Sequence, residues 1–240
     1  MKYGNGQFVA ISSDGANRVM TSPDGVTWTS QTAAAAANSG WNSLIYGDGQ
    51  FVAVANAGDS NLVMTSPDDG ITWTAQKAAV NKSWHWVTYG DGQFVAVADA
   101  GNAPGQQVMT SPNGVDWTGQ NAAAPQFWHS VGYSDGLFAA LSYDGFGQQL
   151  MTSPDGINWT IRESPARGIW QALIYGEGKF VAVSDTGQVM TSDATTIPFG
   201  AGGAGGDGGK SGFFGRGGTG GTGGTAYPGG TNGANGANGG

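Results

Sequence analysis

Short apolar and alternating stretches recur along the first 199 residues and predict β-strands. Over residues 41–76, the run WNSLIY is followed by GDG, by QFVAVA, by NLVMTS, by PDDG and by ITWT. QFVAVA is apolar on both alternating faces, as expected of a strand that is covered on both sides. ITWT alternates apolar and polar residues, as expected of a half-solvated outer strand. No segment has a convincing helical period, so this stretch predicts four strands joined by tight turns.

The same unit occurs five times. YGDGQFVAV begins at Tyr46 and again at Tyr89, and variants begin at Tyr3, Tyr133 and Tyr175, with spacings of 43, 43, 44 and 42 residues. Such a period, with four strands in each unit, is typical of a β-propeller blade. We therefore predict an all-β fold in which residues 1–199 form a five-bladed β-propeller of four-stranded antiparallel blades.

The two terminal units differ from the others. The first blade is expected to lack its inner strand, because nothing before Tyr3 resembles WNSLI. The outer strand of the fifth unit is reduced to a degenerate stretch at 197–199. Three explanations remain: an imperfect ring, further residues upstream, and a strand donated by a neighbouring chain.

The turn before each outer strand carries a family resemblance. SPDDGITW at 66–73 fits the Asp-box pattern S-x-D-x-G-x-T-W, SPDGVTW, SPNGVDW and SPDGINW are one residue shorter, and SDATTIPF from Ser192 has lost the Gly and the Trp. The chain thus resembles sialidase-like (BNR-repeat) propellers, in which the box is a structural hairpin away from the ligand face. The resemblance implies structural roles for Ser22, Asp24, Trp28, Ser66, Asp68, Trp73, Ser111, Trp117, Ser153, Asp155 and Trp159.

Catalysis is not expected, although a sialidase-like glycoside hydrolase is kept as an alternative. Sialidases need an arginine cluster, a Tyr–Glu nucleophile pair and an acid, whereas residues 1–199 hold only Arg18, Arg162 and Arg167, and the only glutamates are Glu163 and Glu177. The Arg positions do not recur at blade spacing.

Composition excludes several other classes. A formal net charge of −8 with nine Lys and Arg disfavours binding to nucleic acid or anionic lipid. The chain has no Cys, hence no thiolate chemistry, and no apolar run as long as a membrane helix needs. No cofactor is expected.

One end of the blades is predicted to bind a ligand. The YGDG and SPDG turns hardly vary and lie at one end, whereas the loops at the other end differ from unit to unit. At that variable end, a Trp is followed by a residue that can donate and accept hydrogen bonds. An aromatic ring beside such a residue suits a sugar, which gives the site Trp41, Asn42, Trp84, His85, Trp128, His129, Trp170 and Gln171. The alternatives are that the Trp residues are core and that the polar residues meet water.

A metal site at this end is not predicted. His85 and His129 could each supply an imidazole, but the sequence places no carboxylate beside them to complete a coordination shell.

Residues 200–240 form a second, different repeat. Glycine occupies every third position from 200 to 239 except position 227, which is Tyr. Strict period-three glycine predicts a polyglycine-II or collagen-like segment, with a flexible linker as the alternative. The segment resembles the glycine-rich parts of bacteriophage tail-fibre and adhesin proteins, where such parts form receptor-reading tips or trimerising stalks.

The two repeats together give a functional hypothesis. We expect a non-catalytic structural or receptor-binding protein of a phage tail or fibre, located in the virion or outside the cell. Its propeller would bind a cell-surface glycan or protein receptor, and its glycine-rich segment would contact other virion subunits in a homo-oligomer. The N-terminus does not read as a secretory signal, which agrees with virion proteins that leave the host by lysis. A subunit of a non-viral extracellular filament is the alternative.

The glycine-rich segment generates a prediction. Replacing Gly218, Gly221 and Gly224 with Ala adds methyl groups where polyglycine-II backbones must touch, so oligomers or fibres held by this segment should be lost while the propeller still folds. Sedimentation velocity and circular dichroism measure the two effects separately. The same sedimenting species before and after the change would show that the period of three has no packing role.

Overall fold

The protein is described here from a computed structural model, which covers residues 1–34, 40–58, 61–99, 105–144, 149–164, 168–193 and 215–216. In this part of the chain every regular element is a β-strand, and the strands form five four-stranded antiparallel sheets. Each sheet, called a blade below, corresponds to one sequence unit, so the predicted all-β architecture of four-stranded units is confirmed.

Within each blade the four strands follow one another in chain order. Blade 1 comprises β1 (Lys2–Gly4), β2 (Gln7–Ile11), β3 (Arg18–Ser22) and β4 (Thr29–Thr32). Blade 2 comprises β5 (Trp41–Gly47), β6 (Gln50–Ala55), β7 (Val63–Ser66) and β8 (Thr74–Gln76). Blade 3 comprises β9 (Trp84–Gly90), β10 (Gln93–Ala98), β11 (Val108–Ser111) and β12 (Thr118–Gln120).

The last two blades repeat this plan. Blade 4 comprises β13 (Trp128–Ser134), β14 (Leu137–Ser142), β15 (Leu150–Ser153) and β16 (Thr160–Arg162). Blade 5 comprises β17 (Trp170–Gly176), β18 (Lys179–Ser184), β19 (Val189–Asp193) and β20 (Gly215–Arg216).

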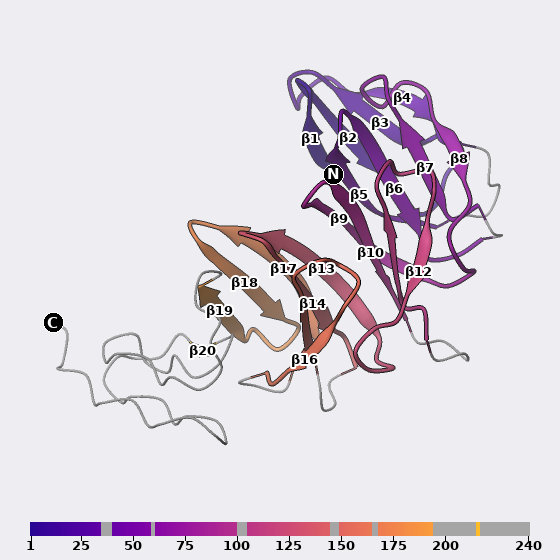
Figure 1. Ribbon diagram of the computed structural model, residues 1–240. Coiled ribbons are helices and arrows are strands. Elements are labelled where there is room, and N and C mark those ends of the chain that lie inside the picture. Colours follow the sequence, from indigo (N-terminus) through magenta and orange to yellow (C-terminus); the bar gives the residue numbers. More distant parts are fainter. Residues whose placement is uncertain are drawn as a thin grey trace, which may run out of the picture.

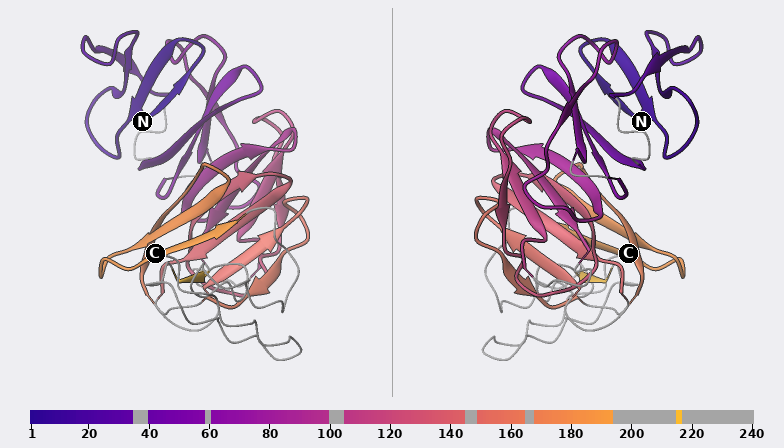
Figure 2. Two further views of the ribbon diagram at one scale, coloured as in Figure 1. Left: turned by 90° about the vertical axis from the view of Figure 1, so that its left-hand side faces the viewer. Right: turned by 90° about the vertical axis from the view of Figure 1, so that its right-hand side faces the viewer.

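The blades stand side by side in sequence order. Each inner strand packs against the inner strand of the next blade, from β1 through β5, β9 and β13 to β17. In the views of Figure 1 and Figure 2, blade 1 (indigo) and blade 5 (orange) lie at opposite ends of this row. Blade 1 and blade 5 are therefore the ends of the row, and each of them packs against only one other blade of the described chain.

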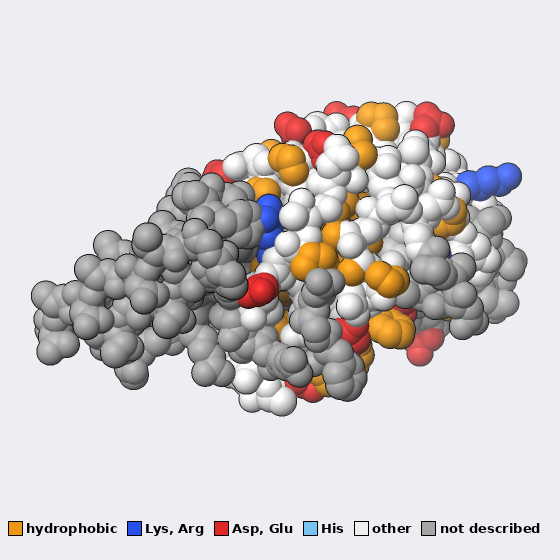
Figure 3. Space-filling view, turned by 60° about the horizontal axis from the view of Figure 1, so that its bottom comes forward, with side chains coloured by type: hydrophobic (Ala, Val, Ile, Leu, Met, Phe, Trp, Pro, Cys, Tyr) orange, Lys and Arg blue, Asp and Glu red, His pale blue; other side chains and the backbone are white. Residues whose placement is uncertain are grey.

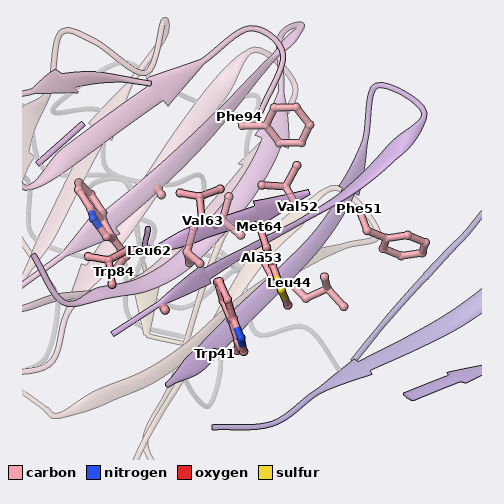
Figure 4. Close-up of a cluster of buried hydrophobic side chains, with 14 of the residues drawn as sticks. Trp41, Leu44, Phe51, Val52, Ala53, Leu62, Val63, Met64, Trp84 and Phe94 are labelled. Atoms are coloured by element: carbon pink, nitrogen blue, oxygen red, sulfur yellow. The ribbon is translucent and has the colours of Figure 1, made fainter. Parts of the chain in front are cut away.

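The core lies between the blades and is built from the same repeat positions. Trp41, Trp84, Trp128 and Trp170, which begin the inner strands of blades 2–5, are at most 2% exposed. Four phenylalanines of the second strands are fully buried as well: Phe51, Phe94, Phe138 and Phe180. Figure 4 shows the part of this core on the two faces of blade 2, with Phe51 and Met64 on one face and Val52 and Val63 on the other.

Neighbouring inner strands approach so closely that one side chain must be absent. A Cβ atom on Gly4, Gly47 or Gly90 would lie only 2.1, 2.3 or 2.0 Å from the ring Cγ of Tyr46, Tyr89 or Tyr133 in the next blade. Such a distance is far below a van der Waals contact, so the Tyr ring occupies the space that any larger residue would fill. This explains the Tyr-Gly pair in the first three phrases, whereas in blade 4 the position is Ser134, beside Tyr175 of blade 5.

In blades 1–4 the turn before the outer strand is fixed by its own polar side chains. In blade 2, Asp68 Oδ1 accepts hydrogen bonds from the Ser66 hydroxyl at 2.8 Å and the Thr72 amide at 2.9 Å. The Trp73 Nε1 donates to the Gly70 carbonyl at 2.8 Å. Matching sets occur around Asp24 and Asp155, and around Asn113 in blade 3. These turns, called Ser–Asp turns below, form locally because the side-chain acceptor replaces backbone partners.

Both terminal blades differ from the sequence prediction. The first blade does have an inner strand, the three-residue β1, because residues 2–4 still pair with β2 although no WNSLI run precedes them. In blade 5 the fourth strand is β20, which pairs with β19 and belongs to the glycine-rich part of the sequence. The predicted outer strand at 197–199 and the glycine-rich residues other than 215–216 lie outside the described residues.

The Ser–Asp turns predict acid-dependent stability. Burial would raise the pKa of Asp155, but hydrogen bonds from Asn158, Ile157 and Ser153 outweigh it and hold the pKa well below its usual value. A carboxyl whose pKa is depressed on folding stabilises the protein above its unfolded pKa of about 4, and this contribution disappears as the pH falls through the folded pKa. Asp155→Asn should therefore lower the unfolding free energy near pH 7, by roughly 1 kcal/mol or less because the group is exposed.

Urea unfolding from pH 7 to pH 2 measures this effect. The difference between wild type and Asp155→Asn should shrink as the pH falls below about 4. Blade 3 supplies the matched control, since it already has Asn113, whose Oδ1 accepts from the Val115 and Asp116 amides at 2.9 Å each. Asn113 Nδ2 donates to Asp116 Oδ2 at 2.9 Å, whereas in blade 4 Asn158 Nδ2 donates to Asp155 Oδ2 at 2.7 Å. The double change Asn113→Asp/Asp116→Asn copies the blade 4 arrangement without placing two carboxylates together, and it should increase acid sensitivity. If the difference in unfolding free energy between wild type and Asp155→Asn does not change with pH, the carboxylate does not have this role.

Candidate functional site

The four polar residues that follow the inner-strand Trp residues occupy equivalent places in blades 2–5. In each blade the pairing with the second strand shifts register at this point, so that Asn42, His85, His129 and Gln171 have no partner in the ladder. A residue left out of the ladder in this way forms a β-bulge, which turns its side chain away from the regular pleat. The bulges therefore place four polar side chains along one end of the row of blades.

Three of these side chains lie next to one another across blades 2–4. Asn42 Nδ2 donates a hydrogen bond to the His85 carbonyl at 2.9 Å, and it lies 3.4 Å from His85 Nδ1. The rings of His85 and His129 are 5.1 Å apart, centroid to centroid. The backbone of Gln171 in blade 5 lies close enough to His129 to influence its pKa. The structure thus brings the sequence-predicted polar residues together.

A second set of residues, which the sequence analysis missed, lies beside the first. Asn56, Asp99, Tyr143 and Asp185 each follow the second strand of their blade. Their amides donate to carbonyls just before the inner strands, for example Asp99 to Ser83 at 3.3 Å and Tyr143 to Phe127 at 2.9 Å. The signal in the sequence was the shared repeat position directly after QFVAVA and its variants.

The second set brings charge and an aromatic ring to the histidines. His85 Nε2 lies 3.0 Å from Asp99 Oδ2, a distance that gives an ion pair when His85 is protonated. Although the two atoms are close, His85 Nε2 makes no hydrogen bond within the described residues. The Tyr143 ring, 43% exposed, lies 5.2 Å from that of His129. We call Asn42, His85, Asp99, His129 and Tyr143 the polar row.

His129 has the most unusual surroundings in the polar row. Burial lowers the pKa of His129, and repulsion from His85 lowers it further, whereas the nearby backbone of Gln171 and the charge of Asp99 oppose this shift. Its Nδ1 atom is buried and has no hydrogen-bond partner among the described residues. A neutral imidazole with one unused nitrogen can accept or donate a hydrogen bond to a bound molecule.

The tryptophans do not have the role that the sequence analysis considered for them. Trp41, Trp84, Trp128 and Trp170 are buried in the interfaces between blades, so none of them has a ring face free to stack on a sugar. Trp84 and Trp128 also donate their indole N–H to the backbone, to Val80 at 3.2 Å and Ala124 at 2.9 Å. They are core residues because the inner strands of blades 2–5 begin within the interface between two blades, so that the first side chain of each strand is already buried.

Other kinds of site find no support in the described part of the chain. No group of three or more His, Asp or Glu side chains there has the geometry to hold a metal ion. The described residues also include no helix that could cross a membrane. On the face in Figure 3, Lys and Arg side chains are isolated, so this face has no continuous basic patch.

Comparisons with known proteins support the fold. No family model matches the sequence, and no curated protein is significantly similar to it. The computationally designed protein Ika8 is similar in structure, with a TM-score of 0.59 and 13% identity, over 83% of this chain and 59% of that protein. The structure of YCF48 bound to D1 peptide is similar with a TM-score of 0.55 and 15% identity, over 80% of this chain and 65% of that protein. YCF48 from Cyanidioschyzon merolae has a TM-score of 0.52 and 12% identity, over 82% of this chain and 70% of that protein.

These similarities, together with the five antiparallel sheets, indicate a β-propeller. The chain spans about 59% and 65% of the first two structures, so its five blades correspond to part of these larger proteins. At such low identities the comparison concerns the fold only.

The polar row predicts how His129 titrates. Its pKa in the folded protein should lie below the value of about 6.5 for a free imidazole. Asp99→Asn removes an attraction for the proton and should lower the pKa of His129 further, whereas His85→Gln removes a repulsion and should raise it. NMR titration of the two imidazoles measures both shifts.

The direction of the His129 pKa shift also determines how the stability of the folded protein depends on pH. Because folding lowers the pKa of His129, the protein should lose stability as the pH falls from about 6.5 through the folded pKa, and His129→Gln should reduce this loss. A His129 pKa that stays the same in both variants would contradict the proximity of the three groups.

Proposed function

We propose that this protein is a non-catalytic binding protein whose propeller holds its ligand at the polar row. The observation that carries the proposal is the alignment of Asn42, His85 and His129 across three blades by β-bulges, with Asp99 and Tyr143 beside them. These side chains come from separate sequence units, and Asn42 joins blades 2 and 3 through the His85 carbonyl. The unpartnered nitrogen of His129 is the kind of buried polar atom that a ligand can satisfy.

The chemistry of the row suits a carbohydrate. Amide and imidazole groups donate and accept hydrogen bonds, as a sugar rim of hydroxyl groups requires, and Asp99 adds an acceptor. With the tryptophans buried, an exposed aromatic surface is offered instead by Tyr143 at 43% and Phe127 at 46% exposure, which are joined by the bond from the Tyr143 amide to the Phe127 carbonyl. One of these rings can cover the apolar face of a pyranose.

A protein receptor is the second candidate. The same two aromatic rings could hold an apolar side chain of a peptide, since exposed aromatic residues are common at protein interfaces. Among the structural neighbours, YCF48 was determined with a bound D1 peptide.

The biological setting is proposed from the sequence. The hydrogen bonds of the Ser–Asp turns support their assignment as Asp boxes of a sialidase-like propeller. The period-three glycine segment supports a bacteriophage tail or fibre protein, or else a subunit of a non-viral extracellular filament, in which the segment mediates assembly. Detection of the protein on purified phage particles by immunogold labelling would distinguish these two settings.

The binding proposal is tested with the full chain on a glycan array and a peptide array. The His85→Ala/His129→Ala double variant should lose at least about tenfold in affinity for the ligand that is found, as expected when hydrogen bonds to a desolvated site are removed. Tyr143→Phe should keep most of the affinity and Tyr143→Ala should lose it, because the ring face is what contacts the ligand.

Ile157→Ala is the matched control. Ile157 is 46% exposed in a Ser–Asp turn at the other end of blade 4, so its replacement should leave binding unchanged. Binding that survives the double histidine change would remove the polar row from the site. Turnover of a sialoside by the wild-type chain would overturn the non-catalytic assignment and favour the hydrolase.

A further inference from the structure

Each blade has two different faces. In blade 2, the strand registers place Ile45, Val52, Val54 and Val63 on one face, called the valine face. They place Tyr46, Phe51, Ala53 and Met64 on the other, called the tyrosine face. The residues at the same repeat positions define these two faces in every blade.

Blades always meet valine face to tyrosine face. The Ser–Asp turn of blade 2 lies over the valine face of blade 1, where a Cβ on Gly70 would be 2.8 Å from Val9. Gly114 and Gly156 repeat this relation to Val52 and Val95, at 2.9 Å each. The Tyr rings of blades 2, 3 and 4 lie over Gly4, Gly47 and Gly90 of the preceding blade, and Tyr175 of blade 5 lies beside Ser134.

Blade 5 has its valine face uncovered. Ile174, Val183 and Val189 are 63%, 41% and 53% exposed. At the same positions of blade 3, Thr88 is 8% exposed and Val97 and Val108 are fully buried. Nothing lies within 4 Å of a Cβ built on Gly176, although the equivalent Gly4, Gly47 and Gly90 each receive a Tyr ring.

Blade 1 has the opposite face uncovered. Tyr3 is 59% exposed and Met20 is 43% exposed, whereas Met64, at the position of Met20 in blade 2, is fully buried. Gly25, in the Ser–Asp turn of blade 1, would contact only Phe8 of its own blade. The chain therefore carries an unused Tyr at one end and an unused Gly at the other, and in this structure they do not meet.

We propose that a second copy of this chain joins these two ends, with the tyrosine face of its blade 1 on the valine face of blade 5. Tyr3 of one copy would occupy the space beside Gly176 of the other. The contact is the one that already joins the blades inside the chain, and neither face has to change to make it. This proposal does not depend on the ligand of the polar row.

Two polar contacts between blades can be repeated at the new interface. The Tyr175 hydroxyl donates to Asp135 Oδ2 of the preceding blade at 2.7 Å, and Glu177 provides a carboxylate at the position of Asp135 for the hydroxyl of Tyr3. Gln50 Nε2 donates to the Asn113 carbonyl of the next blade at 2.8 Å. Lys179 occupies the position of Gln50 and can donate to the equivalent carbonyl of Asp24. The interface is thus head-to-tail, and its repetition gives closed rings or open chains of copies.

The inference is tested by sedimentation equilibrium of the full chain over a range of concentrations. Wild type should self-associate. Tyr3→Ala should weaken association by about 30-fold or more by removing the ring. Gly176→Ala should also weaken it, because the new methyl group lies where the Tyr3 ring must fit if the contact follows Gly4, Gly47 and Gly90. Gly176→Ala should leave the melting temperature of the monomer unchanged, whereas Gly90→Ala, which places a Cβ 2.0 Å from Tyr133 within the chain, should lower it.

Mixing the two interface variants is the decisive measurement. Gly176→Ala retains a good tyrosine face and Tyr3→Ala retains a good valine face, so the mixture should form a one-to-one heterodimer that neither variant forms alone. This result also separates the interface from association through the glycine-rich segment, which both variants retain. Ile71→Ala, which removes an exposed apolar side chain (53%) outside both faces, is the control and should associate like wild type.

Three results would overturn the proposal. Wild type that remains monomeric up to its solubility limit would show that another partner, or the same chain, covers the two faces. Variants that associate as strongly as wild type would place the interface elsewhere. A mixture that contains no heterodimer would show that Tyr3 and Gly176 do not meet.

Discussion

The close approach of neighbouring inner strands is the contact on which the structure depends. At the point where the strands are nearest, a Tyr ring of one blade occupies the space of the missing side chain of the Gly in the preceding blade, about 2 Å from where a Cβ would stand. This contact sets the spacing of neighbouring blades, and the Trp and Phe side chains are buried between them. The Tyr-Gly pair therefore serves packing at Gly4, Gly47 and Gly90, and the second glycine of each phrase serves the turn, with φ of 74° at Gly49.

The two ends of the blades have different constraints. At the end of the Ser–Asp turns, hydrogen bonds within each turn and contacts to the preceding blade leave little freedom to vary. At the other end, a β-bulge interrupts each inner strand just after the buried Trp, so the next side chain leaves the packed interface. A binding surface can change there, from Asn42 to His85 to His129, without disturbing the core. This separation between a fixed end and a variable end is what makes the fold suitable for the proposed binding role.

The way in which blades pack leaves the first and last blades of the row able to bind further blades. A blade needs a neighbour on each face, and the first and last blades each have one face exposed to water. Exposed valine and isoleucine at blade 5 and exposed tyrosine and methionine at blade 1 are the two halves of the contact that recurs within the chain. Burial of such apolar surface is favourable, which is the physical reason to expect association between copies.

The sequence by itself determined the number of units, their strands and their turns. The identical phrases at Tyr46 and Tyr89 predicted the period, and the apolar run QFVAVA predicted a strand covered on both faces, because these properties depend on local pattern. The outer strand was placed too early: β8 is Thr74–Gln76, and residues 71–73 of ITWT lie in the turn, where the Trp73 indole donates to the Gly70 carbonyl. The sequence also predicted that Asn42, His85, His129 and Gln171 lie at equivalent places. Only the tertiary structure decided that the adjacent tryptophans are buried and that Asp99 and Tyr143 join the histidines, since both depend on how deep each strand sits between two blades. The pairing of β19 with β20, and the failure of Tyr3 to reach Gly176, likewise depend on contacts between residues far apart in the chain.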